Sequence, residues 1–170
     1  MSLAGSFLVA RPTLHDPNFS RAVVLLLAHT SDGAFGVVVN RPVSSLALPF
    51  PVFDGGPCPS PGVVILHGHP DWVDAEAAPE GPVAGPEAAP GIFIGDASCL
   101  SRAAKPHPGK TVLCRVYRGF AGWEGGQLER ELADGVWGVV PANGPLLFDT
   151  PSEELWDRLA PPAIPQPSLN

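Results

Sequence analysis

Hydrophobic positions in the first third of the chain come in short, nearly continuous runs, which are typical of strands buried on both faces. Val23–His29 and Phe35–Asn40 are two such runs. The polar segment between them contains Asp32-Gly33, a pair that favours a β-hairpin turn because glycine adopts a positive φ without strain. A third apolar run occupies Phe7–Ala10. The pattern therefore predicts a hairpin and a neighbouring strand.

The rest of the chain alternates between further strands and short helices. A capping aspartate predicts a helix over Asp96–Ala104, and leucines four residues apart predict another over Gly125–Asp134. The capping box Thr150–Glu153 predicts a last helix through Leu159. The remaining predictions are strands at Val63–His67, Ile92–Ile94, Thr111–Tyr117, Val136–Val140 and Leu146–Phe148, a helical turn at Ser44–Leu48, and a surface excursion over residues 70–90.

Composition explains why these elements are short. The 170 residues include 19 glycines and 22 prolines, yet 45% are hydrophobic and only 16% are charged. Such a chain is too apolar to be disordered and long enough to bury a core. We expect an α+β fold with one domain over residues 1–159 and a proline-rich, flexible tail over residues 160–170.

Charge and cysteine usage limit the partners and the location. Ten Lys and Arg stand against 17 Asp and Glu, a net charge of −7, whereas nucleic-acid binding depends on cations that face phosphates. The longest apolar run, Ala22–Ala28, is far shorter than the ~20 residues of a membrane-crossing helix. Cys58, Cys99 and Cys114 are odd in number and widely spaced, which indicates free thiols. We expect a cytoplasmic protein with no membrane segment and no direct nucleic-acid contact.

Few residues indicate a metal or anion site. His67-Gly68-His69 places two imidazoles on one face of a strand, and Asp71 or Cys58 could complete a metal site. The spacing matches no established zinc pattern, so we expect no metal and no cofactor, with His67 and His69 as the alternative. Gly55-Gly56 could present N–H groups to an anion, although glycines there more often allow a turn.

Catalytic motifs are also scarce. The sequence lacks a G-x-S-x-G nucleophile turn, a phosphate-binding P-loop and a G-x-G-x-x-G dinucleotide loop. If the protein is an enzyme, the candidate reactive groups are His15, His29 and the cysteines. The cysteines have no evident activating neighbour, His15-Asp16 would need a third group that the sequence does not place, and the end of an apolar strand favours a structural role for His29.

Three blocks of sequence resemble a known family. Residues 5–24 (GSFLVARPTLHDPNFSRAVV), 33–42 (GAFGVVVNRP) and 119–132 (GFAGWEGGQLEREL) are similar to the YqgE/AlgH family of bacterial proteins, and the likeness covers residues 1–67 and 111–157. The resemblance implies a small closed β-barrel that continues into a bifurcated mixed sheet surrounded by helices. Its members are labelled transcriptional regulators and have no agreed biochemical activity. The segments 43–54 and 68–90 of this chain are short and rich in Pro and Ala, whereas relatives often carry longer segments at these places.

The three blocks contain five polar or aromatic residues from which we predict a ligand-binding cleft. If the strand end and the helix start converge, they form a cleft with an aromatic wall, an amide and two guanidiniums, which suits an anionic ligand. The residues are Arg21, Asn40, Arg41, Trp123 and Gln127. In the alternative interpretation the two arginines pair with Asp16, Asp54 or Glu131 and only hold loops in place.

The sequence thus favours a regulatory or binding protein that acts through a small anionic ligand or a protein partner. One alternative is an enzyme of unrecognised type that uses the same cleft. Another is a direct DNA-binding regulator, which the net charge disfavours. The oligomeric state stays open.

Overall fold

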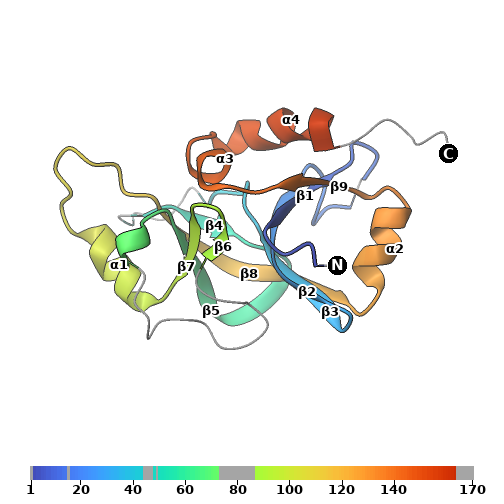
Figure 1. Cartoon of the computed structure of the whole chain (residues 1–170), viewed down its shortest axis with the longest axis horizontal. Coiled ribbons are helices and arrows are strands. Elements are labelled where there is room, and N and C mark those ends of the chain that lie inside the picture. The colour runs from blue at the N-terminus through green and yellow to red at the C-terminus, as the bar shows by residue number, and fades with distance from the viewer. Residues whose placement is uncertain (1, 15, 44–47, 49, 73–86, 164–170) are drawn as a thin grey trace.

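A strongly curled sheet organises the molecule (Figure 1). The computed structural model describes residues 2–14, 16–43, 48, 50–72 and 87–163. The strands are β1 (Ser6–Ala10), β2 (Val23–Thr30), β3 (Gly33–Val38), β4 (Val52–Asp54), β5 (Cys58–His67), β6 (Glu87–Ala89), β7 (Ile92–Gly95), β8 (Cys114–Glu124) and β9 (Trp137–Pro141). The helices are α1 (Ala97–Ala104), α2 (Gln127–Ala133), α3 (Gly144–Phe148), α4 (Ser152–Ala163) and the 3₁₀ turn η1 (Pro70–Trp72).

The order of the nine strands is β6-β7-β5-β8-β3-β2-β1-β9, with β4 beside β8. All neighbours are antiparallel except β4, which runs parallel to β8. One edge of β8 carries β4 at Val116–Arg118 and β3 at Ala121–Glu124, while the other edge carries β5. The sheet is therefore mixed and branches at β8.

The two ends of the sheet approach each other without forming a ladder. In the described part of the chain β6 and β9 are not paired. Instead, the N–H of Gly144, at the start of α3, donates to the carbonyl of Pro90 in the β6–β7 turn at 2.8 Å. The strand pairings therefore show a curled sheet rather than the closed barrel that the family resemblance implied.

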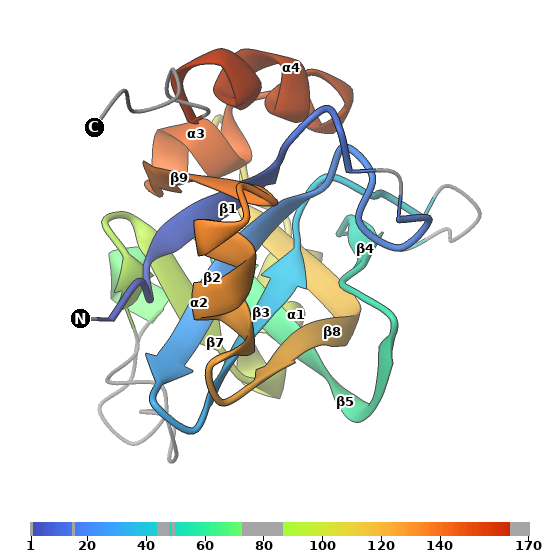
Figure 2. The same ribbon diagram turned by 90° about the vertical axis from the view of Figure 1, so that its right-hand side faces the viewer.

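Both faces of β2 are buried, as its continuous apolar run predicted, whereas β3 is fully buried only from Gly36 to Val38. The same double burial holds for β1. Along β1, Phe7 and Val9 face a core that includes residues of α3 and α4, whereas Leu8 and Ala10 face a second core that includes Leu128 of α2. Helix α4 packs on β1 and β9, and α2 packs on β3, β8 and β9 (Figure 2). Because successive side chains of a strand point to opposite faces, alternate residues of β1 pack into two separate hydrophobic cores.

Most element predictions are confirmed. The β2–β3 hairpin pairs Thr30 with Gly33, whose φ is 145°. The Asp96 side chain caps α1 by accepting from the N–H of Ser98 at 2.9 Å. Helix α2 ends before Gly135, where φ is 74°. Two strands are longer than predicted: β8 begins later but runs to Glu124, and β5 begins at Cys58.

One prediction is wrong, and others fall partly outside the described residues. Leu146–Phe148 belongs to α3 and not to a strand, because Asn143 caps the helix through the N–H of Leu146 and a proline occupies its first turn. Helix α4 continues to Ala163, so the first residues of the expected tail are helical. The turn at 44–47, residues 73–86 of the excursion and residues 164–170 lie outside the described part.

Two glycines allow β4 to approach β8. A Cβ on Gly55 would lie 2.5 Å from the carbonyl oxygen of Gly119. Gly56 has a φ of 148°, and its Cβ would lie 2.3 Å from the carbonyl group of Phe120. The N–H of Gly55 donates to the carbonyl of Arg118 at 2.7 Å, and that of Gly56 to the Asp54 carboxylate at 3.3 Å. Both N–H groups proposed for an anion are therefore engaged within the chain.

Gly56→Ala should lower the free energy of unfolding by about 1–3 kcal/mol, because the methyl group adds a backbone clash to an unfavourable φ. Chemical denaturation measures this loss. Gly62→Ala is the matched control, since no atom lies within 4 Å of its added Cβ. Equal losses in the two variants would contradict this account of the junction.

Candidate functional site

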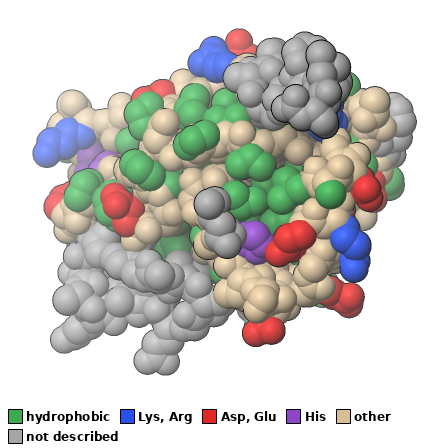
Figure 3. Space-filling view, turned by 45° about the vertical axis from the view of Figure 1, so that its right-hand side comes forward, with side chains coloured by type: hydrophobic (Ala, Val, Ile, Leu, Met, Phe, Trp, Pro, Cys, Tyr) green, Lys and Arg blue, Asp and Glu red, His purple; other side chains and the backbone are tan. Residues whose placement is uncertain are grey.

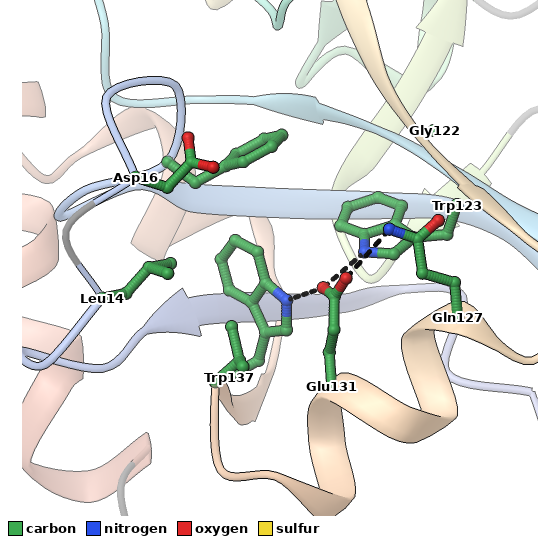
Figure 4. Close-up of a pocket in the computed structure, with 9 residues that line it drawn as sticks. Leu14, Asp16, Gly122, Trp123, Gln127, Glu131 and Trp137 are labelled. Atoms are coloured by element: carbon green, nitrogen blue, oxygen red, sulfur yellow. Dashed lines mark hydrogen bonds between the residues drawn. The ribbon is translucent and has the colours of Figure 1, made fainter.

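A pocket of about 240 Å³ opens between the loop after β1 and helix α2 (Figure 4). The loop contributes aliphatic, acidic and aromatic side chains, β8 contributes an indole, and α2 contributes an amide and a carboxylate. The complete lining is Leu14, Asp16, Phe19, Gly122, Trp123, Gln127, Glu131, Val136 and Trp137. These residues come from two stretches of the chain, residues 14–19 and 122–137, that are far apart in sequence, so only the fold brings the two sides of the pocket together.

The Glu131 carboxylate fixes the polar side of the pocket. Its Oε1 accepts from the indole N–H of Trp123 at 3.0 Å and from that of Trp137 at 2.8 Å. Its Oε2 accepts from the side-chain amide of Gln127 at 2.9 Å. Glu131 and Gln127 share a helix face because they are four residues apart. Both indoles are buried, so their N–H groups need an acceptor. One carboxylate satisfies them and thereby holds both rings in place.

Aromatic rings form the apolar side of the pocket. Phe19 lies 6.3 Å from Trp123 and 5.7 Å from Trp137, measured between ring centroids. The two tryptophans lie 6.1 Å apart with their planes at 73°, an edge-to-face arrangement that is favourable for aromatic pairs. The pocket wall is thus a packed aromatic cluster.

Asn40 and Arg41 hold the backbone of the pocket loop. The Arg41 guanidinium donates to the carbonyl of Asn18 and, at 3.0 Å, to that of Ser20. The Asn40 side chain accepts from the N–H of Val23 and donates to the carbonyl of Arg21, each at 3.0 Å. Neither side chain lines the pocket. Arg41 therefore orders the loop as the alternative interpretation expected, but through carbonyls and not through carboxylates.

Arg21 points toward helix α4 instead of the pocket. It has a φ of 58°, the left-handed region that side chains seldom adopt. Its guanidinium lies 3.0 Å from the Asp157 carboxylate and 4.5 Å from the centre of the Trp156 ring. Of the five residues predicted to share a cleft, the pocket brings together Trp123 and Gln127.

Three residues of the site are not among the ligand-binding residues that the sequence predicts. Glu131 is predicted only as a partner of an arginine, and Phe19 and Trp137 carry no sequence signal of a pocket. The signal for Glu131 was available in its spacing from Gln127. Trp137 lies six residues after Glu131, beyond the end of the helix, and no local pattern predicts that the carboxylate of Glu131 accepts from its indole N–H.

His67 and His69 use their rings to accept backbone N–H groups. Nδ1 of His67 accepts from His69 at 3.2 Å, and Nε2 of His69 accepts from Leu113 at 2.9 Å. In a neutral imidazole the second nitrogen then carries the proton and cannot bind a metal. Within the described ranges no three His, Cys, Asp or Glu side chains form a cluster that could hold a metal ion. The two histidines therefore serve the structure.

Burial keeps His67 neutral. Its side chain is fully buried, and its Nε2 has no hydrogen-bond partner among the described residues. Desolvation lowers the pKa of His67 to about 4, and the neighbouring His69 and Arg102 act in the same direction. Burial also lowers the pKa of His69.

Of the groups considered for catalysis, His29 is engaged, Cys99 and Cys114 are buried, and Cys58 is half-buried. Nδ1 of His29 accepts from the N–H of Leu3 at 3.0 Å, and its Nε2 lies 3.1 Å from the Glu129 carboxylate. Desolvation raises the pKa of the Cys99 thiol and raises that of Cys114 to about 11, which disfavours the reactive thiolate. His15 lies outside the described residues.

Comparison with known proteins identifies the family. A family model described as AlgH-like matches residues 7–163. The chain belongs to the AlgH-like family. This confirms the resemblance inferred from the sequence blocks.

Relatives and solved structures agree with this assignment. A UPF0301 protein of Xylella fastidiosa (strain M23) is 34% identical, with 94% of this chain and 88% of the relative aligned. A UPF0301 protein of Chlamydia trachomatis (serovar L2b) is 31% identical over 89% and 82% of the two chains. The solution structure of AlgH from Pseudomonas aeruginosa matches with a TM-score of 0.69 at 30% identity, covering 95% and 88%. The crystal structure of a Corynebacterium diphtheriae protein matches with a TM-score of 0.72 at 23% identity, covering 98% of this chain and 88% of that protein. At this identity the match supports the fold alone.

Glu131→Ala should lower the free energy of unfolding by about 2–4 kcal/mol, because it leaves two buried indole N–H groups without an acceptor. Denaturant unfolding followed by tryptophan fluorescence measures the loss. Arg130→Ala, an exposed truncation on the same helix, should cost far less. A loss no greater than that of Arg130→Ala would show that Glu131 does not hold the indoles.

Stability should fall as the pH drops from 6.5 toward 4. In this range the unfolded chain protonates His67, whereas the folded protein keeps it neutral, so the unfolded state binds more protons. The contribution reaches at most about 3 kcal/mol. In His67→Asn, whose side-chain oxygen can still accept from His69, unfolding curves at a series of pH values should show a shallower slope. An unchanged slope would contradict this assignment.

Proposed function

We propose that this AlgH-like protein is a regulatory binding protein whose ligand occupies the pocket between the β1 loop and α2. The observation that supports this proposal is the clamp of Glu131 on two buried indoles. It holds an aromatic wall in position before any ligand arrives, and pre-formed pockets with few polar groups are typical of ligand sites. The regulatory role implied by the family resemblance fits a protein that responds to an occupied pocket.

Binding is favoured over catalysis by the state of the polar side chains in the pocket. The side chains of Asp16, Trp123, Gln127, Glu131 and Trp137 all hydrogen bond within the chain. These bonds hold each side chain in one orientation, which favours recognition of a ligand over transfer of a proton. The Glu131 carboxylate accepts three N–H groups and is suited to fixing geometry.

A small ligand is favoured over nucleic acid. The face in Figure 3 shows Lys and Arg as separate side chains near its margins, with hydrophobic, uncharged and acidic groups between them. The net charge of −7 adds to this argument. All three cysteines are free, which fits the cytoplasmic location predicted from the sequence. The part of the chain described here contains no helix long and apolar enough to cross a membrane.

The pocket can be tested by a fragment screen followed in the NMR signals of the four indole N–H groups. We expect bound fragments to shift the signals of Trp123 and Trp137, which line the pocket, and to leave those of Trp72 and Trp156 unchanged. Leu14→Phe, which fills the pocket, should weaken such fragments by at least about tenfold.

Val139→Phe is the matched control, because Val139 is exposed on β9 outside the pocket. Its fragment affinities should equal those of the unmodified protein. A screen in which no fragment shifts Trp123 or Trp137 would overturn the proposed function, as would equal losses of affinity in the two phenylalanine variants.

A further inference from the structure

We propose that the pocket selects a planar organic cation, a guanidinium group on a short aliphatic stem. This inference rests on the proposed function and names the ligand class of the same site. It departs from the anionic ligand predicted from the sequence, which depended on Arg21 and Arg41 facing the cleft.

The charges around the pocket favour a cation. Asp16 and Glu131 contribute carboxylates, and the lining contains no Lys or Arg among the described residues. The guanidinium groups near the pocket contact other parts of the molecule. Arg41 donates to carbonyls of the loop, Arg21 pairs with Asp157, and the Arg11 guanidinium lies beside Gly135. A pocket lined by charge of one sign concentrates ligands of the opposite sign.

Glu131 is a half-buried carboxylate that lacks a cationic partner in the described part of the chain. Three neutral N–H donors stabilise it, two at Oε1 and one at Oε2. A carboxylate oxygen can accept two hydrogen bonds, so Oε2 retains one free lone pair. Burying a carboxylate without a counter-charge is costly. A cationic ligand would supply the missing charge.

Asp16 provides a second acceptor on the opposite side of the pocket (Figure 4). Its Oδ1 accepts from the N–H of Asn18 at 2.7 Å, which orients the carboxylate. The exposed side chain has no ion pair with any described residue. Both carboxylates line the pocket, so a ligand with several N–H groups has two acidic acceptors there.

The aromatic wall favours a planar cation over a compact one. Guanidinium groups stack on aromatic faces, and the electron-rich face of an indole attracts positive charge. Trp123, Trp137 and Phe19 supply three such rings within one pocket of about 240 Å³. That volume accommodates a guanidinium group with a stem of a few carbons. An ammonium group is more compact and would contact less of the aromatic surface than a planar guanidinium.

Butylguanidinium and butylurea provide a matched test, since they share shape and length and differ in charge. The readout is the shift of the Trp123 and Trp137 indole signals during titration. We expect butylguanidinium to bind at least about tenfold more tightly than butylurea, and more tightly than butylammonium. A blocked tripeptide with a central arginine, compared with its citrulline counterpart, tests whether the group can come from a protein as well as from a free small molecule.

Asp16→Asn should reduce the preference for the cation by about fivefold or more, because it removes one of the two carboxylates. Asp134→Asn is the control, since it changes net charge equally and lies outside the pocket lining. Asp134→Asn should leave the preference intact. Both variants retain the indole clamp, so folding is checked by the unchanged indole spectrum.

The outcomes separate this inference from the proposed function. If neutral fragments or butylurea shift the two indoles as strongly as butylguanidinium, the pocket binds ligands but the cation inference is wrong. Inorganic phosphate shifting the same signals would overturn it in favour of an anion. If no compound shifts Trp123 or Trp137, both proposals fail. A preference for the cation that persists in Asp134→Asn and falls in Asp16→Asn supports the inference.

Discussion

The geometry of strand β8 constrains most of this molecule. Its eleven residues form hydrogen-bonded pairs with β5 along one edge and with both β4 and β3 along the other. The branch is possible because Gly55 and Gly56 let one backbone approach another more closely than any side chain allows. Beyond the branch, β8 delivers Trp123 to the second core, against α2. The junction and the pocket wall therefore lie on one continuous strand.

The pocket combines two kinds of polar interaction that do different work. Asn40 and Arg41 bind the backbone of the β1 loop and fix its path. Glu131 binds side chains and fixes the aromatic wall. Glu131 satisfies two buried indole N–H groups that would otherwise stay unpaired, at a cost of about 1–3 kcal/mol for each unpaired group. Asn40 and Arg41 act at part-buried and exposed positions of the loop. The charged residues closest to the site therefore act first as structural supports, and the charge left for a ligand is that of the carboxylates.

Much of the secondary structure was predictable because its signals are local. The hairpin depends on Asp32-Gly33, and helix α1 depends on the cap that Asp96 forms with the backbone two residues later. The failure at Leu146–Phe148 has a local cause as well. Three apolar residues favour a strand, but Asn143 and Pro145 start a helix before them. Burial against the first core then favoured the helical alternative.

The sequence by itself determined the alternation of short strands and helices, the burial of both faces of β2, and membership of the AlgH-like family. These properties follow from periodicity, turn residues and local motifs that each span a few positions. Only the tertiary structure decided which side chains meet. The Arg41 guanidinium donates to carbonyl groups, and the Glu131 carboxylate accepts from indole N–H groups. Each side chain hydrogen bonds with the partners that the fold brings within reach. Arg41 contacts a loop 21 to 23 residues earlier, and Glu131 contacts indoles on the strands before and after α2, so the choice depends on how the fold places whole elements. Carboxylates line the pocket where guanidiniums were expected.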